Sequence, residues 1–218
     1  MTRIAVLASG EGTTTEALMR AHANGRMECE LGLVVTNKST AGIIERIQKV
    51  NAELGTDVEI LVINQDTHPD VQHQKPIRGM NNRESAAILH EVDVREIGLV
   101  CVLGYNRVIR GELLDELGWK PHYQDVYQAR MINTHPGILP QTAGYYGLKI
   151  AQCAIDLGLT HTAHTVHVVA EEVDAGPIFK ETRIGIMPYH TAQTLYADLQ
   201  DLEKLVLPHI IDDFASHP

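Results

Sequence analysis

The chain has 218 residues, with 18 Lys or Arg against 28 Asp or Glu, so its formal net charge is −10 at pH 7. This length suffices for one large domain, and a hydrophobic fraction of 44% excludes wholesale disorder. The acidic balance opposes a nucleic-acid-binding surface, and no apolar run approaches the roughly 18 residues of a membrane-spanning helix. The three cysteines are too widely spaced for a disulfide framework or a CxxC metal site, so we expect a cytoplasmic protein.

The first half of the sequence alternates short β-branched runs with helical stretches. Strands are predicted at residues 4–8, 31–36, 58–63 and 98–103, and helices at 14–23, 41–53 and 83–92. Continuous apolar runs separated by helices indicate a parallel sheet that is covered on both faces. The predicted fold class is therefore α/β: a doubly wound, mostly parallel, twisted sheet with helices on both faces.

The second half has a different pattern. It predicts strands at 130–134, 162–170 and 177–186, a helix at 147–157, and an amphipathic helix over 191–215 that is interrupted at Pro208. Residues 64–82 and 119–129 are predicted to be long loops. Because there is no repeat or linker, we expect a single domain over 1–218, with halves of about 1–100 and 101–218.

A Gly-rich segment, Ser9 to Thr14 (SGEGTT), lies between the first predicted strand and the first helix. Free N–H groups at a helix start, together with the helix dipole, suit a phosphate group. The segment lacks the Gly-Lys-Ser/Thr ending of a P-loop. It also lacks the third glycine and the acidic ribose ligand of a dinucleotide-binding fingerprint. A phosphate site and a plain tight turn with Thr13 as the helix cap both remain open.

Asn133 and His135 are two residues apart at the end of a predicted strand, so their side chains project to the same side while Thr134 faces away. Pro136 stops the strand and keeps His135 extended. An amide donor beside a titratable imidazole is what acyl transfer needs, namely an oxyanion stabiliser and a proton-transfer group. The alternative is a hydrogen-bonded strand terminus without a catalytic role.

Two further features of the second half could carry chemistry. His161, His164 and His167 lie on one predicted strand, but His164 faces away from the other two, so no metal site is expected. Asp174 lies in a tight Val-Asp-Ala-Gly-Pro turn between two strands. It is either a functional carboxylate or an ordinary turn-forming residue.

Four segments together resemble the folate-dependent formyltransferases: SGEGTT, LGYNRVI at 103–109, INTHPGILP at 132–140 and EEVDAGPI at 171–178. The segments occur in the family's order and span essentially the whole chain. The resemblance implies transfer of a formyl group from 10-formyltetrahydrofolate, as cosubstrate, to a primary amine through a tetrahedral intermediate. It points within the family to the members of purine biosynthesis that formylate glycinamide ribonucleotide.

The resemblance also implies roles for individual residues. Asn133 would donate to the oxyanion, and His135, protonated in the tetrahedral intermediate, would assist it. Asp174 would hold the imidazole and help to relay the proton through water, so we expect it within hydrogen-bond or one-water reach of His135. The N-terminal half would bind phosphate, and the C-terminal half would carry catalysis and folate binding. The implied binding residues are Gly12, Thr13 and Thr14 for the phosphate, Gln200 and Glu203 for the ribose, and Arg83, Tyr105, Asn106, Arg107, Val108, Glu172 and Val173 for folate. The resemblance further predicts a cis Leu139–Pro140 bond.

Some positions depart from the family pattern, and these departures leave the acceptor open. Gly137 replaces the usual Ser, Gly12-Thr13-Thr14 replaces Gly-Ser-Asn, and Ala163-His164 replaces Gly-Thr. Another amine acceptor, such as an amino sugar nucleotide, is the main alternative. The charge of −10 opposes tRNA, and the intact catalytic residues oppose a non-catalytic nucleotide-binding module. We expect small-molecule substrates, no metal, no nucleic acid or membrane, and a monomer or homodimer.

Overall fold

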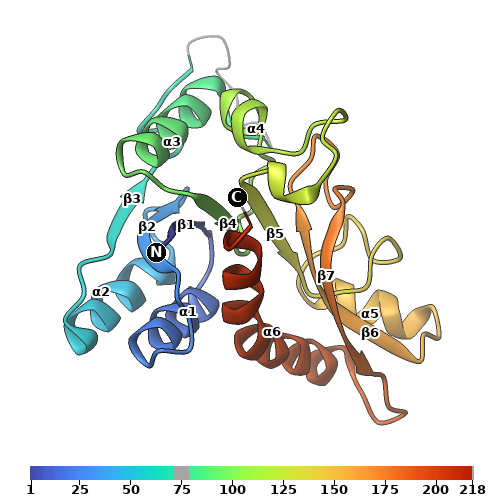
Figure 1. Cartoon of the computed structure of the whole chain (residues 1–218). Coiled ribbons are helices and arrows are strands. Elements are labelled where there is room, and N and C mark those ends of the chain that lie inside the picture. The colour runs from blue at the N-terminus through green and yellow to red at the C-terminus, as the bar shows by residue number, and fades with distance from the viewer. Residues whose placement is uncertain (71–78, 218) are drawn as a thin grey trace.

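The computed structural model describes residues 1–70 and 79–217, and within these ranges the strands form one seven-stranded sheet (Figure 1). The sheet order is β3-β2-β1-β4-β5-β6-β7. The strands are β1 (Arg3–Leu7), β2 (Glu30–Thr36), β3 (Glu59–Val62), β4 (Leu99–Val102), β5 (Met131–His135), β6 (His161–Val168) and β7 (Ile178–Gly185). Each predicted strand is present, with its ends within two residues of the prediction.

The first five strands are parallel, whereas β6 pairs antiparallel with both β5 and β7. The chain builds outward from β1 through β2 to β3, then crosses back and continues from β4 on the other side of β1. The boundary between β1 and β4 is therefore the topological switch point. Sheets of this kind bind ligands at this point, beyond the carboxyl ends of the strands.

Helices cover both faces of the sheet, which confirms the doubly wound prediction. In Figure 1, α3 and α4 lie above the sheet, and α1, α2 and α6 lie below it. The helices of the described residues are α1 (Thr13–Ala23), α2 (Gly42–Leu54), α3 (Asn82–Val94), α4 (Glu112–Leu117), α5 (Leu148–Asp156) and α6 (Ala192–Ala215), with a short 3₁₀ turn at Val126–Gln128.

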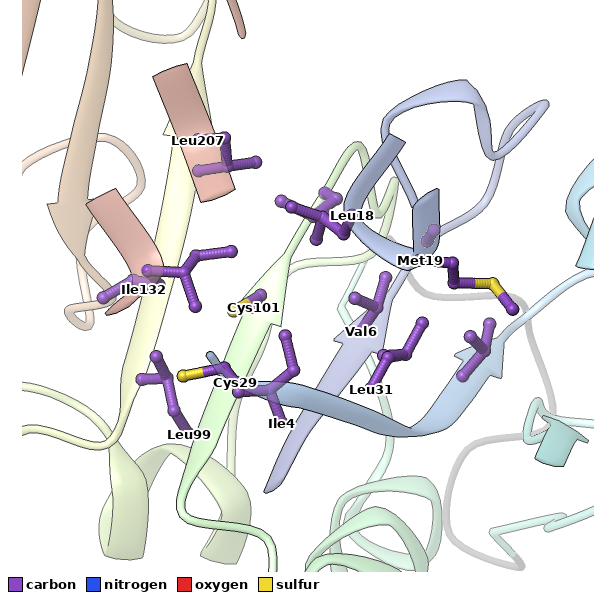
Figure 2. Packing of buried hydrophobic residues seen from close by; sticks show 14 of the residues in the cluster. Ile4, Val6, Leu18, Met19, Cys29, Leu31, Leu99, Cys101, Ile132 and Leu207 are labelled. Atoms are coloured by element: carbon purple, nitrogen blue, oxygen red, sulfur yellow. The ribbon is translucent and has the colours of Figure 1, made fainter. Parts of the chain in front are cut away.

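Side-chain alternation along β1 divides the core into two layers. Ile4 and Val6 pack toward α1, α2 and α6, whereas Ala5 and Leu7 pack toward α3 and α4. Figure 2 shows the first layer, which also contains Cys101 as a small buried side chain. Burial raises the pKa of the Cys101 thiol, so this side chain is an inert core residue.

The predicted interruption at Pro208 is wrong, because α6 runs without a break from Ala192 to Ala215. Pro208 is buried there beside Leu207 and Ile211. Packing of this apolar face compensates for the hydrogen bond that a proline removes from the helix. No helix in the described part of the chain is long and apolar enough to cross a membrane.

The predicted loops are only partly irregular. The loop at 119–129 contains the 3₁₀ turn, and the short helix α4 before it was not predicted. The loop at 64–82 includes residues 71–78, which lie outside the described residues, and its last residue begins α3. Asn81 caps α3 with its side chain, and Glu84 completes the capping box by accepting from the Asn81 N–H.

Candidate active site

A cavity of about 700 Å³ lies at the carboxyl ends of β4 and β5, next to the switch point. This volume falls within the usual range for small-molecule sites. Asn133 and His135 of β5, His167 of β6 and Asp174 of the β6–β7 loop line this cavity, and so do residues 104–109. The predicted catalytic residues are thus brought together in one cavity.

The alternation along β5 positions two of these groups as predicted. Asn133 and His135 both line the cavity, and the hydroxyl of Thr134 donates to Glu203 Oε1 at 2.8 Å, on the α6 side. The chain then turns through Pro136 and a cis Leu139–Pro140 bond, which confirms that prediction. His135 is almost fully buried, with 3% of its surface exposed.

The hydrogen-bond partners of His135 define its neutral tautomer. The Thr142 hydroxyl donates its single proton to the Ile138 carbonyl at 2.8 Å, so it accepts from His135 Nε2–H at 2.9 Å. In the neutral ring the lone pair is therefore on Nδ1. That atom lies 3.7 Å from Asp174 Oδ2, so the predicted proximity of the two side chains is confirmed.

Asp174 is held with its carboxylate directed toward two imidazoles. Its Oδ2 accepts from the Gly144 N–H at 2.9 Å, and its Oδ1 lies 3.7 Å from His167 Nε2. Gly176 allows this loop to approach the sheet, because a Cβ at that position would lie 1.9 Å from the Val168 carbonyl oxygen. The carboxylate side chain is 9% exposed and therefore faces the cavity rather than solvent.

Two effects act on the pKa of His135 in opposite directions. A carboxylate beside an imidazole favours the charged ring. Burial instead dominates and lowers the pKa of His135 below its ordinary value of 6.5, with Asp174 opposing the shift only in part. The ring is therefore neutral near pH 7 in the free protein, and its Nδ1 lone pair is available for a proton.

His167 belongs to the site, although the sequence analysis assigned no role to it. Its Nδ1–H donates to the Val168 carbonyl oxygen at 3.0 Å, so the neutral Nε2 accepts from Asn133 Nδ2 at 2.9 Å. This contact orients the Asn133 amide and leaves its second N–H free. Burial lowers the pKa of His167 below its ordinary value, which favours this neutral form. Its position opposite Asn133 in the β5–β6 register was the missing signal.

The Gly-rich turn is linked to the cavity through Glu203. Gly12 has a φ of 72°, and a Cβ there would lie 2.5 Å from Ile43, so this tight approach to α2 requires glycine. Helix α1 begins at Thr13, its N-cap residue is Gly12, and no side chain caps it. The alternative in which Thr13 caps the helix is therefore wrong. The Thr14 hydroxyl donates to Glu203 Oε2 at 3.2 Å, and Glu203 in turn accepts from Thr134 beside the cavity.

All but one of the predicted folate-binding residues line the cavity. They are Tyr105, Asn106, Arg107, Val108, Glu172 and Val173. Arg107 binds the buried carboxylate of Glu84 at 2.8 Å and the Gly79 carbonyl oxygen at 2.7 Å, so its guanidinium is directed inward. Arg83 is exposed on α3 and does not line the cavity, and Gln200 lies on α6 outside it.

The 105–108 segment also contains buried polar atoms that a ligand could satisfy. Within the described residues, neither the Tyr105 hydroxyl nor Arg107 Nε has a hydrogen-bond partner. Burial raises the pKa of the Tyr105 hydroxyl, so it stays protonated and can donate. A polar heterocycle in an apolar slot fits such a wall.

The histidines of β6 do not form a metal centre. His164 faces Glu203, and His167 faces the cavity. Among the described residues, no group of three His, Cys, Asp or Glu side chains is arranged to hold a metal ion.

Comparison with known proteins agrees with this arrangement. Residues 2–211 match the formyl transferase family, so the chain belongs to that family. The phosphoribosylglycinamide formyltransferase of Bacillus subtilis is 26% identical over 97% of this chain and 93% of its own length. The trifunctional purine biosynthetic protein adenosine-3 of Gallus gallus is 27% identical over 98% of the chain, which spans only 18% of that longer protein.

Solved structures give the same result. A crystal structure of glycinamide ribonucleotide transformylase 1 from Geobacillus kaustophilus superposes with a TM-score of 0.77 at 26% identity, covering 99% of each chain. The seven-stranded sheet and its covering helices are therefore the family fold.

Proposed function

We propose that this protein transfers the formyl group of 10-formyltetrahydrofolate to the primary amine of glycinamide ribonucleotide, a step of purine biosynthesis. The observation that carries the proposal is the convergence of Asn133, His135 and Asp174 in one cavity, next to the Thr14–Glu203–Thr134 chain of hydrogen bonds. The names of its relatives support the choice of substrates.

In this proposal Asn133 stabilises the oxyanion that develops on the formyl oxygen when the amine attacks. His167 Nε2 fixes one N–H of the Asn133 amide, so the other can point at the developing charge. Removal of one such donor costs roughly 3–4 kcal/mol of transition-state stabilisation in other enzymes. A donor that is oriented in advance needs no reorganisation when the charge appears.

His135 takes up the proton that the attacking amine must lose. The neutral ring receives it at Nδ1, and the resulting imidazolium is then paired with Asp174, whose carboxylate lies 3.7 Å away. When the tetrahedral intermediate collapses and the bond from the formyl carbon to the folate nitrogen breaks, the imidazolium would return this proton to the leaving nitrogen, which restores the neutral ring. The ring thus becomes charged only as the oxyanion forms, so its charge stabilises the transition state more than the ground state. Asp174 offsets the cost of this buried charge.

The two substrates would bind to different parts of the site. Gly12, Thr13 and Thr14 would hold the phosphate at the start of α1, where backbone N–H groups and the helix dipole favour an anion. Gln200 and Glu203 would bind the ribose hydroxyls. Folate would lie in the slot formed by the 105–108 segment, Glu172 and Val173, where it would supply the formyl group, with Arg83 outside the cavity near the end of its tail.

The proposal treats residues 1–218 as one cytoplasmic formyltransferase domain, as a monomer or homodimer, that acts on small molecules without a metal, nucleic acid or membrane. The continuous sheet across both halves supports a single domain.

A formyl-transfer assay tests the proposal. Purified protein is incubated with 10-formyltetrahydrofolate and, separately, glycinamide ribonucleotide, an amino sugar nucleotide and free glycinamide, and formation of tetrahydrofolate and N-formyl product is measured. We expect turnover with glycinamide ribonucleotide and a large loss with free glycinamide, which lacks the ribose phosphate. If only the amino sugar nucleotide is formylated, the proposed acceptor is wrong and the amino sugar nucleotide takes its place. If no amine is formylated, the proposed formyltransferase function is rejected.

A further inference from the structure

His164 is a buried titratable side chain that the proposed mechanism does not use. It lies on β6, is fully buried, and neither ring nitrogen has a hydrogen-bond partner among the described residues. A neutral imidazole has one donor and one acceptor, and groups of this kind are normally paired when they are buried. An unpartnered ring at such a position therefore needs an explanation.

The polar group facing this ring is the Glu203 carboxylate. His164 Nε2 lies 3.7 Å from Glu203 Oε1, with 0% of the histidine side chain and 11% of the glutamate side chain exposed. This separation is longer than the upper limit of about 3.2 Å for a direct N–H···O hydrogen bond, so the two groups face each other without a direct bond in this structure. Whether it is neutral with its proton on Nε2 or doubly protonated, the ring presents an N–H group to Glu203.

Glu203 is the group through which a role for His164 would act. Its two oxygens already accept from Thr14 on α1 and from Thr134 on β5. A carboxylate has about four acceptor positions, so a third partner still leaves one for a ligand hydroxyl. A donor on β6 would hold the carboxylate from a third element, in addition to α1 and β5, and would offset its negative charge near the proposed phosphate site.

We propose that His164 is a positioning residue that holds Glu203 in the orientation needed to bind the phosphorylated acceptor. The proposal rests on the proposed function for the identity of that acceptor. The role of His164 is confined to binding, because Glu203 lies on the side of β5 opposite the catalytic Asn133 and His135. Its removal should weaken acceptor binding and leave folate binding unchanged.

The test is a double-mutant cycle with His164→Leu, Glu203→Gln and the double variant. Dissociation constants for glycinamide ribonucleotide and for a folate analogue are measured by calorimetry, and stability is measured by urea unfolding of the same four proteins. We expect His164→Leu to weaken acceptor binding about tenfold, the effect of one lost hydrogen bond to a charged group. The same change in the Glu203→Gln background should have an effect below about twofold.

Two further variants guard the interpretation. His164→Gln keeps an N–H donor and should restore much of the acceptor binding. This variant also tests the proposal if His164→Leu does not fold. His161→Gln, on the partly exposed start of the same strand, is the matched control and should leave both dissociation constants unchanged.

The outcomes separate the two claims. Equal effects of His164→Leu in both backgrounds, or equal weakening of acceptor and folate binding, would overturn the positioning role. If the unmodified protein binds no glycinamide ribonucleotide, the proposed function fails, and the unfolding cycle still decides the pairing. In that case non-additive unfolding free energies support the His164–Glu203 contact, and additive ones refute it.

Discussion

Asp174 adopts a left-handed backbone conformation with a φ of 59°, which most side chains avoid but Asp and Asn tolerate. This conformation directs its carboxylate into the cavity, where the Gly144 N–H holds it between the rings of His135 and His167. The turn and the catalytic interpretations of this residue are therefore compatible, since the turn conformation presents the charge.

Replacement of Asp174 with Asn separates the charge from the shape. Asn accommodates the same backbone and can still accept from Gly144, but it cannot pair with a protonated His135. We expect kcat to fall at least about 10²-fold, the low end of a general acid–base contribution. The KM values and the circular dichroism spectrum should change little. A folded variant with near-normal kcat would reduce Asp174 to a turn residue.

Gly137 is a second residue at which a small change should affect the site, because there is no space for a Cβ atom. A Cβ there would lie 2.4 Å from Thr142 Oγ1, 2.4 Å from Ile150 Cγ2 and 3.0 Å from His135 Nε2. We expect Gly137→Ser to lower the free energy of unfolding by about 1–3 kcal/mol through overpacking, and to lower kcat by displacing Thr142. Urea unfolding and steady-state kinetics measure both effects.

Gly10 provides the matched control for this substitution, because a Cβ there meets nothing within 4 Å. Gly10→Ala should change the free energy of unfolding by less than about 1 kcal/mol. Similar losses for the two variants would mean that the crowding around Gly137 relaxes freely.

Among the elements, the start of α1 lies closest to the proposed phosphate site. Thr14→Asp places a carboxylate there, next to Glu203, and like charge should repel the acceptor phosphate. Acceptor KM should rise about tenfold or more, whereas the folate KM should stay unchanged. Thr14→Ser keeps the hydroxyl and is the control. An unchanged acceptor KM in Thr14→Asp would mean that the phosphate of the acceptor does not bind at the start of α1.

The sequence pattern alone predicts most of the strands of the sheet and part of the candidate active site. Asn133 and His135 were predictable because the two-residue repeat of a strand is local. His167 was not, because its role depends on β6 running antiparallel to β5 in a register that pairs it with Asn133. Likewise, Pro208 ends an isolated helix, and only the tertiary packing of its buried face keeps α6 continuous.

For the whole molecule, the buried imidazoles predict a pH-dependent stability. Burial lowers the pKa of both His135 and His167, so below about pH 6.5 the unfolded chain binds protons that the folded chain does not. The free energy of unfolding should therefore fall as pH decreases from about 6.5, and should vary little through these groups above that value. Urea unfolding between about pH 5 and pH 8 measures this slope.

His167→Gln identifies the source of this slope. Glutamine cannot titrate, so the decline in stability below about pH 6.5 should become shallower than in the unmodified protein. An identical slope in the variant would assign the pH dependence to other groups.

The carboxylate of Glu203 is 189 positions from Thr14 and 69 from Thr134, the residues it joins. During synthesis, β1 to β5 and their helices leave the ribosome long before α6 does. Until α6 docks, the growing chain has the Gly-rich turn and the strand that carries the proposed catalytic residues, but it lacks the carboxylate that joins them. The acceptor therefore has no complete site on a partial chain, and it cannot stabilise a nascent intermediate by binding. Ligand-dependent resistance to proteolysis should appear abruptly, only when residues 192–215 have emerged.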